Sequence, residues 1–144
     1  MDLSLLNFDT PVDVINQAMK QSLIGNIGIT VTAVGDGVVE GFLILSEKNC
    51  RPDGILHGGT NLAMAETLAG LGSMLIIDMN EYNSFGIQVS GNHIGILSEG
   101  KALGEAKIIH RGNMTHIWNV DIKNEEGRFL SSIRVTNMIV KRNA

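Results

Sequence analysis

The chain has 144 residues, which is enough for one domain with a substantial hydrophobic core. Hydrophobic residues make up 44% of it and charged residues 18%, a composition that excludes an intrinsically disordered chain. The formal net charge of −4 and the lack of a long basic run argue against nucleic acid as the main partner.

The single cysteine, Cys50, cannot form a disulfide within the chain. The first nine residues lack the basic and apolar regions of a secretory signal. We therefore expect a cytoplasmic protein with one domain over residues 1–144. Because the histidines are scattered and the cysteine lies apart from them, we expect no metal site and no cofactor.

The first predicted element is a helix that begins at Thr10-Pro11 and ends near Gly25, so residues 1–26 form an N-terminal helical segment. Threonine is a common capping residue and proline suits the first helical position. Apolar residues recur at helical spacing along this segment: Val12, Ile15, Met19 and Leu23.

Two runs rich in β-branched residues follow, over 27–33 and 38–45, and the Gly35-Asp36-Gly37 sequence between them predicts a hairpin. After a polar loop, a helix is predicted from about residue 59 to 79. It is apolar on nearly every side, which is typical of a buried helix. Its small residues and its lack of basic flanks argue against a membrane span.

The rest of the chain predicts four strands, over 86–96, 101–110, 115–123 and 128–140. Because the connections are short, strands that are neighbours in sequence should pair antiparallel. The predicted class is α+β, with an antiparallel sheet of about six strands against one long helix. Such a sheet covers the helix on one side only, so a second subunit is the simplest source of further cover.

Glu66 stands in the middle of the apolar helix, where a buried carboxylate is costly unless it is paired or has a chemical task. The sequence His57-Gly58-Gly59 lies where this helix should begin. Together these features indicate an active site built on one helix. The alternative for Glu66 is a structural acid paired with an arginine.

The segment from Arg51 to Gly59, followed by Leu62-Ala63-Met64-Ala65-Glu66-Thr67, resembles the signature of hotdog-fold thioesterases. The resemblance is greatest to the phenylacetate-degradation type, which includes the dihydroxynaphthoyl-CoA thioesterases. Three further segments match the usual run of that family: Asn92-His93, His110-Arg111-Gly112 and Gly127-Arg128. The resemblance implies a hotdog fold, in which five or six strands wrap around the long helix. It also implies a homodimer, often paired into a homotetramer, with two equivalent active sites at each dimer interface.

The first turn of a helix has backbone N–H groups without partners inside the helix, and they carry partial positive charge. We assign the Gly58 N–H as the main donor to the thioester carbonyl, aided by Gly59, and Glu66 as nucleophile or general base. Gly58 and Glu66 are about 12 Å apart along the helix axis, at ~1.5 Å per residue. The resemblance implies that the acid comes from the opposite subunit. His57 either contacts the thioester region or only hydrogen-bonds in the turn.

The candidate substrate-binding residues are Arg51, Gly59, Gly70, Ser73, His93 and Arg111. Arg51 replaces the glutamine usual in the family; it cannot accept a hydrogen bond, and its charge could instead pair with Glu66. Gly70 replaces a usual serine or threonine, for which Ser73 or Thr67 could substitute. Arg111 is the candidate cation for a coenzyme A phosphate, and His93 is either structural or near the acyl pocket.

The leading hypothesis is therefore an acyl-CoA thioesterase that needs no cofactor, has coenzyme A as part of its substrate, and binds neither nucleic acid nor membrane. The alternative is a non-catalytic acyl-thioester-binding protein, favoured by Arg51 and Gly70. A hotdog-fold hydratase would need an Asp/His pair on a different loop pattern, which the sequence lacks.

Overall fold

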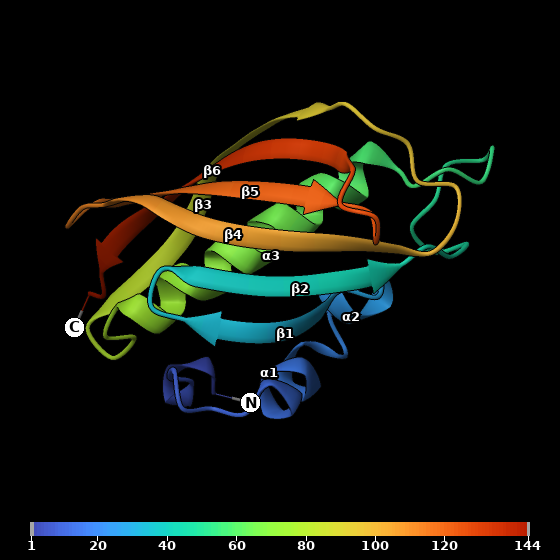
Figure 1. The fold of residues 1–144 in the computed structure, drawn as a ribbon. Helices are drawn as coiled ribbons and strands as arrows, with labels where there is room; N and C mark the ends of the chain where they lie inside the picture. The colour runs from blue at the N-terminus through green and yellow to red at the C-terminus, as the bar shows by residue number, and fades with distance from the viewer. Residues whose placement is uncertain (1, 144) are drawn as a thin grey trace.

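The computed structural model describes residues 2–143, which form one six-stranded antiparallel sheet packed on a long helix (Figure 1). In chain order the elements are a 3-10 turn over Leu3–Leu5, α1 Val12–Met19, α2 Leu23–Asn26, β1 Thr30–Gly35, β2 Val38–Ile44, α3 Gly58–Ile76, β3 Tyr82–His93, β4 Lys101–Arg111, β5 Thr115–Lys123 and β6 Phe129–Lys141. This arrangement confirms the predicted α+β class and the hotdog fold.

The sheet order is β1-β2-β4-β5-β6-β3. The hairpins β1–β2, β4–β5 and β5–β6 form as their short connections predict. The prediction that all sequence neighbours pair is wrong for β3, which pairs with β6 while β4 pairs with β2. The reason is that α3 carries the chain from β2 to the far side of the sheet, so β3 becomes the opposite edge strand and β4 returns to the middle.

The N-terminal helical segment is broken, where one continuous helix was predicted. α1 ends at Met19, and Ser22 caps the separate short helix α2 by accepting a hydrogen bond from the Ile24 N–H at 3.2 Å. Pro11, not Thr10, occupies the N-cap position of α1. Asn16 joins α1 to the sheet, since its side-chain amide exchanges two hydrogen bonds with the backbone of Val31, each 2.8 Å long.

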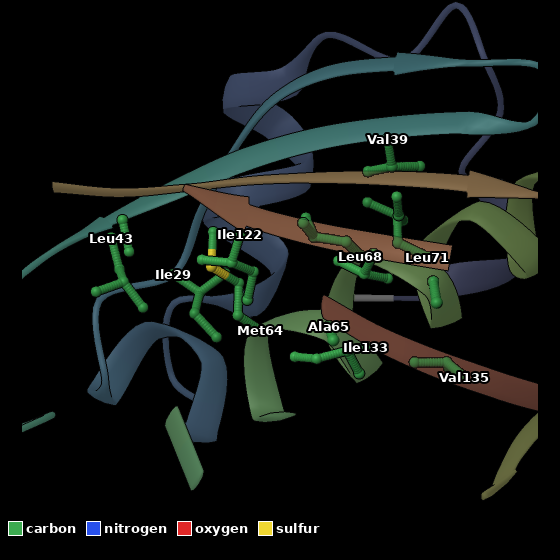
Figure 2. Packing of buried hydrophobic residues seen from close by; sticks show 14 of the residues in the cluster. Ile29, Val39, Leu43, Met64, Ala65, Leu68, Leu71, Ile122, Ile133 and Val135 are labelled. Atoms are coloured by element: carbon green, nitrogen blue, oxygen red, sulfur yellow. The ribbon is translucent and has the colours of Figure 1, made fainter. Parts of the chain in front are cut away.

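The core lies between α3 and the concave face of the sheet (Figure 2). Met64 and Leu68 of α3 are fully buried and approach the sheet where Gly41 of β2 pairs with Gly104 of β4. A Cβ atom at Gly104 would lie 2.9 Å from side-chain atoms of both Met64 and Leu68. The two paired glycines therefore let the helix pack directly on the strand backbones.

One side of α3 is not covered within the chain. Exposed or half-buried residues recur along it every three or four positions: Gly59, Leu62, Ala63, Glu66, Thr67, Gly70 and Met74. We call this set the open stripe. The neighbouring edge strand β3 is also largely exposed, and the side chains of Phe85 and Ile87 are each 54% accessible. The sheet thus covers α3 on one side only, as the sequence predicts for the single chain.

None of the helices in residues 2–143 combines the length and the apolar character needed to cross a membrane.

Candidate active site

The start of α3 presents one free backbone amide. His57 is the N-cap, and its Nδ1 atom accepts a hydrogen bond from the Gly59 N–H at 2.8 Å. The Gly58 N–H has no hydrogen-bond partner among residues 2–143. The Gly58 amide is therefore free for the predicted role of donor, whereas the Gly59 amide, which was predicted to aid it, is already occupied by His57. Of the two interpretations of His57, the structure shows the hydrogen-bonded turn.

His93, at the end of β3, lies against the backbone of Gly58. A Cβ atom at position 58 would be only 2.7 Å from the Nε2 atom of His93, so no larger residue fits there without moving the ring. The other ring nitrogen, Nδ1, is 2.7 Å from the Ser131 hydroxyl. His93 thus lies at the same site as Gly58, which agrees with its interpretation as a residue near the acyl pocket.

A pocket of about 360 Å³ opens at this end of α3. Gly58, Asn61 and His93 form its polar part, Arg51 lies at its edge, and Ile55, Leu56, Ile94 and Ile96 provide its apolar surface. A polar backbone donor beside apolar side chains is the usual composition of a small-molecule site. The structure therefore brings together four of the residues singled out in the sequence: Arg51, His57, Gly58 and His93.

Two residues of this site were missed in the sequence analysis. Asn61 is 4% exposed and its Nδ2 donates to the Ser131 Oγ at 2.8 Å; Ser131 itself is fully buried. The signal for Asn61 was present, because it is an amide side chain one turn inside an otherwise apolar helix. Ser131 gave no such signal, since nothing in its strand indicated which residue it would face.

The side chain of Glu66 is exposed in the single chain, which corrects the prediction that it is buried. It lies on the open stripe next to β3, where a Cβ atom at Gly86 would be 3.8 Å from its Oε1 atom. Among residues 2–143 no arginine or lysine pairs with Glu66. The alternative of a structural ion pair therefore finds no support within the chain.

Arg51 pairs with Asp53 and not with Glu66, the partner that the sequence suggested. Its guanidinium lies 2.6 Å from the Asp53 carboxylate, and both side chains are about half exposed. Such an exposed pair contributes little to stability. Its consequence is positional, because the pair holds the arginine head at the rim of the pocket.

Gly70 lies on the open stripe with no atom within 4 Å of where its Cβ would be. Ser73, by contrast, is completely buried and does not reach the pocket. Its Oγ accepts hydrogen bonds from Trp118 Nε1 and Asn137 Nδ2, both 2.9 Å long, and lies 3.1 Å from His116 Nδ1. Since both acceptor positions of the hydroxyl are occupied, its proton goes to His116. The proposed substrate contact of Ser73 is therefore wrong for this chain.

His116 is 2% exposed, and its ring must be neutral to accept the proton of Ser73. Burial, and secondarily the positive charges of Arg111 and His110, lower the pKa of His116 below its ordinary value of 6.5. The cluster of Ser73, His116, Trp118 and Asn137 is thus a buried neutral network that fixes the C-terminal half of α3 to β5 and β6.

Arg111 does not lie with Gly58 in the single chain. It ends β4 at the opposite end of α3, lines a separate hollow of about 620 Å³ with Ile76 and Ile77, and pairs with Asp36 at 2.8 Å. Residues 2–143 contain no group of three or more His, Cys, Asp or Glu side chains arranged to hold a metal ion.

The sequence profile of the thioesterase superfamily matches residues 53–131, which include the start of α3, Glu66, His93 and Ser131. The chain belongs to the thioesterase superfamily. Thioesterase PA1618 of Pseudomonas aeruginosa, solved as a variant, has 28% sequence identity and superimposes with a TM-score of 0.89 over 93% of this chain and 96% of its own. Thioesterase HI1161 of Haemophilus influenzae has 27% identity and a TM-score of 0.87 over 95% and 96%.

A curated relative from Escherichia coli is named 1,4-dihydroxy-2-naphthoyl-CoA hydrolase. It is 26% identical over 90% of this chain and 94% of its own length. These relatives confirm the family expected from the Arg51–Gly59 segment and establish this superfamily member as a thioester hydrolase.

Proposed function

We propose that this thioesterase hydrolyses an acyl- or aryl-CoA thioester to the free acid and coenzyme A, at a site shared by two copies of the chain. The observation that carries the proposal is the pair of open groups on α3. The amide of Gly58 and the carboxylate of Glu66 both lack partners among residues 2–143, yet ~12 Å of helix separates them. One carbonyl cannot contact both groups of the same helix.

A second copy of the chain resolves the separation. The outer edge of β3 has no pairing strand within the described residues and is flanked by exposed Phe85 and Ile87. An unpaired apolar edge strand favours pairing with another strand. Antiparallel pairing of two β3 strands about a twofold axis places two α3 helices side by side in opposite directions. Glu66 of one copy then approaches Gly58 of the other, and the open stripes cover each other.

In the proposed reaction the Gly58 N–H donates a hydrogen bond to the thioester carbonyl oxygen and stabilises the negative charge that develops there. As general base, Glu66 takes a proton from water while the water oxygen bonds to the carbonyl carbon. The C–S bond then breaks and the sulfur of coenzyme A leaves, taking the proton from Glu66. As nucleophile, Glu66 instead bonds to the carbonyl carbon and the C–S bond breaks with loss of the coenzyme A thiolate. The mixed anhydride that results is hydrolysed by water to the free acid and the Glu66 carboxylate. Both roles fit the same position of the carboxylate.

The name of the E. coli relative, 1,4-dihydroxy-2-naphthoyl-CoA hydrolase, supports coenzyme A as the carrier. The apolar surface of the pocket, provided by Ile55, Leu56, Ile94 and Ile96, suits an uncharged acyl or aryl group. Gly70 is compatible with the same substrate class, because its lack of a side chain leaves room for substrate beside Glu66 on the stripe.

The test of the shared site is subunit mixing with two inactive variants. The first is Glu66→Gln, which keeps the size of the side chain and removes the base. The second is Gly58→Pro, which removes the amide proton at the first helical position, where proline is tolerated. The extended backbone of His57, with ψ 132°, is compatible with a following proline. Gly58→Ala is the matched control, because it introduces the same contact with His93 and keeps the amide.

Each variant alone should lose at least ~10²-fold in kcat on a panel of acyl-CoA esters, measured by release of free thiol. An equal mixture that exchanges subunits should recover about a quarter of wild-type activity, because half of the dimers are mixed and each has one intact site. No recovery in a mixture shown to contain mixed dimers would contradict the shared site. Gly58→Pro activity equal to that of Gly58→Ala would contradict the role of the amide.

A single turnover in ¹⁸O-labelled water, with enzyme in excess, separates the two roles of Glu66. A general base places the label in the released acid only. A nucleophile whose mixed anhydride is hydrolysed at the Glu66 carbonyl places the label in the carboxylate of Glu66, where mass spectrometry of the peptide detects it.

A further inference from the structure

Three polar side chains beside the Gly58 amide form a chain of hydrogen bonds that the proposed reaction does not yet use. Asn61 Nδ2 donates to Ser131 Oγ at 2.8 Å, and Ser131 Oγ lies 2.7 Å from His93 Nδ1. Asn61 and Ser131 are buried, at 4% and 0% exposed. His93 Nε2 has no hydrogen-bond partner among residues 2–143 and lies closest to the Cβ position of Gly58.

The direction of the hydrogen bonds follows from counting protons. The Ser131 hydroxyl has one proton and receives a donor from Asn61, so its own proton is free to go to His93 Nδ1. The neutral ring then carries its proton on Nε2. In the opposite direction His93 Nδ1–H donates to Ser131. The Ser131 proton then has no acceptor among residues 2–143 unless Asn61 turns its amide, so that Oδ1 accepts it.

Turning the amide is the more costly arrangement. In the observed orientation one buried atom, Asn61 Oδ1, lacks a partner within the described residues. In the turned orientation that place is taken by an NH₂ group, which has two protons to satisfy. Both orientations keep one hydrogen bond between Asn61 and Ser131, and buried N–H groups without a partner are rarer in proteins than buried carbonyl oxygens without one. The observed orientation is therefore the stable one.

We propose that Asn61 and Ser131 are positioning residues that hold His93 as the Nε2–H tautomer, so that its ring presents a second hydrogen-bond donor beside the Gly58 amide. The ligand of this second donor, the thioester carbonyl oxygen, rests on the proposed function. The tautomer itself does not depend on that function. Two converging donors are the usual way in which a developing oxyanion is held.

The experiment reverses the direction of the chain. Asn61→Asp replaces the amide by a group that only accepts, so the Ser131 proton turns toward position 61 and His93 Nδ1–H donates to Ser131. Long-range ¹H–¹⁵N NMR of the histidine rings distinguishes the two tautomers. At alkaline pH we expect the wild type to show Nε2–H for His93 and Asn61→Asp to show Nδ1–H. His93→Gln assigns the signal.

Ser131→Ala is the second variant, and it keeps the test open if a carboxylate at position 61 prevents folding. It breaks the chain without a buried charge, so the ring should populate both tautomers. We expect kcat on acyl-CoA esters to fall about tenfold in Ser131→Ala and ~10²-fold in Asn61→Asp, with KM changed less than twofold, since the lost donor acts on the transition state.

Nδ1–H in the wild type, or an unchanged ring in Ser131→Ala, would overturn the positioning role. A changed tautomer with unchanged kcat would overturn the donor role of His93. Glu66→Gln separates this inference from the proposed function, because it should abolish hydrolysis and leave the His93 signal as in the wild type.

Discussion

Gly72 is the position where a single added methyl group should have the largest structural effect. It lies on the buried face of α3, and a Cβ atom there would be 2.3 Å from Cη2 of Trp118 and 2.7 Å from Cζ2. The indole ring is fully buried and its Nε1–H donates to Ser73 Oγ at 2.9 Å. Because the ring is held on both sides, Gly72→Ala forces either the helix or the hydrogen bond to move.

The expected cost combines three effects. Overpacking a core by one methyl group typically costs 1–3 kcal/mol, here about 2. Lengthening or breaking the hydrogen bond between Trp118 and Ser73 adds about 1 kcal/mol. Alanine favours a helix over glycine by about 1 kcal/mol, which offsets part of this. The net destabilisation is about 2 kcal/mol, or a fall in Tm of about 6–8 °C for a domain of this size at fixed protein concentration.

A double-mutant cycle tests the cause. Urea unfolding of Gly72→Ala, Trp118→Phe and the double variant gives the coupling between the two positions. Phenylalanine removes the outer ring atoms that the new methyl group meets. We therefore expect Gly72→Ala to be neutral or stabilising in the Trp118→Phe background. A cost that stays near 2 kcal/mol in that background would refute the contact as its origin.

Three further predictions concern stability and the rim of the pocket. Ser73→Ala should lower the free energy of unfolding by about 3 kcal/mol in urea, because it leaves the buried partners of its hydroxyl unsatisfied. The pKa of His116 is lowered in the folded state, so the unfolded state takes up a proton first as the pH falls. The free energy of unfolding should therefore fall below about pH 6.5, by at most ~1.4 kcal/mol per pH unit. Urea titrations of His116→Gln should lose this dependence. Arg51→Gln should change stability by less than ~0.5 kcal/mol, since its pair with Asp53 is exposed, while raising kcat toward acyl-CoA esters by restoring a hydrogen-bond acceptor at the rim.

Local patterns in the sequence predicted most of the fold. The strand predicted over 115–123 formed as β5, in which His116, Trp118, Val120 and Ile122 alternate on the buried face. The Gly35-Asp36-Gly37 turn formed as expected, with Gly37 at a φ of +80°. These predictions succeeded because a hairpin and an amphipathic strand depend on residues close together in sequence.

The errors have a different physical origin. The pairing of β3 with β6 depends on the path of α3 beneath the sheet, and no local pattern records that path. Ser131 became part of the site for the same reason, because β6 and β3 place it beside His93. The apolar character of α3 predicted that the sheet covers one side of this helix and leaves another side open. It could not show which residues face the sheet and which form the open stripe.

That last distinction explains why Glu66 lies where it does. The buried face of α3 carries three polar residues, Thr60, Asn61 and Ser73, and each of them is hydrogen-bonded inside the chain. The open stripe carries an unpaired carboxylate among small and apolar residues, a combination that a solvent-exposed surface does not require. A residue pattern too apolar for solvent and too polar for a sealed core fits a surface covered by a second copy of the chain with substrate between the two. On this reasoning the reaction determines which residues form the open stripe, and folding determines which residues form the cluster of Ser73, His116, Trp118 and Asn137.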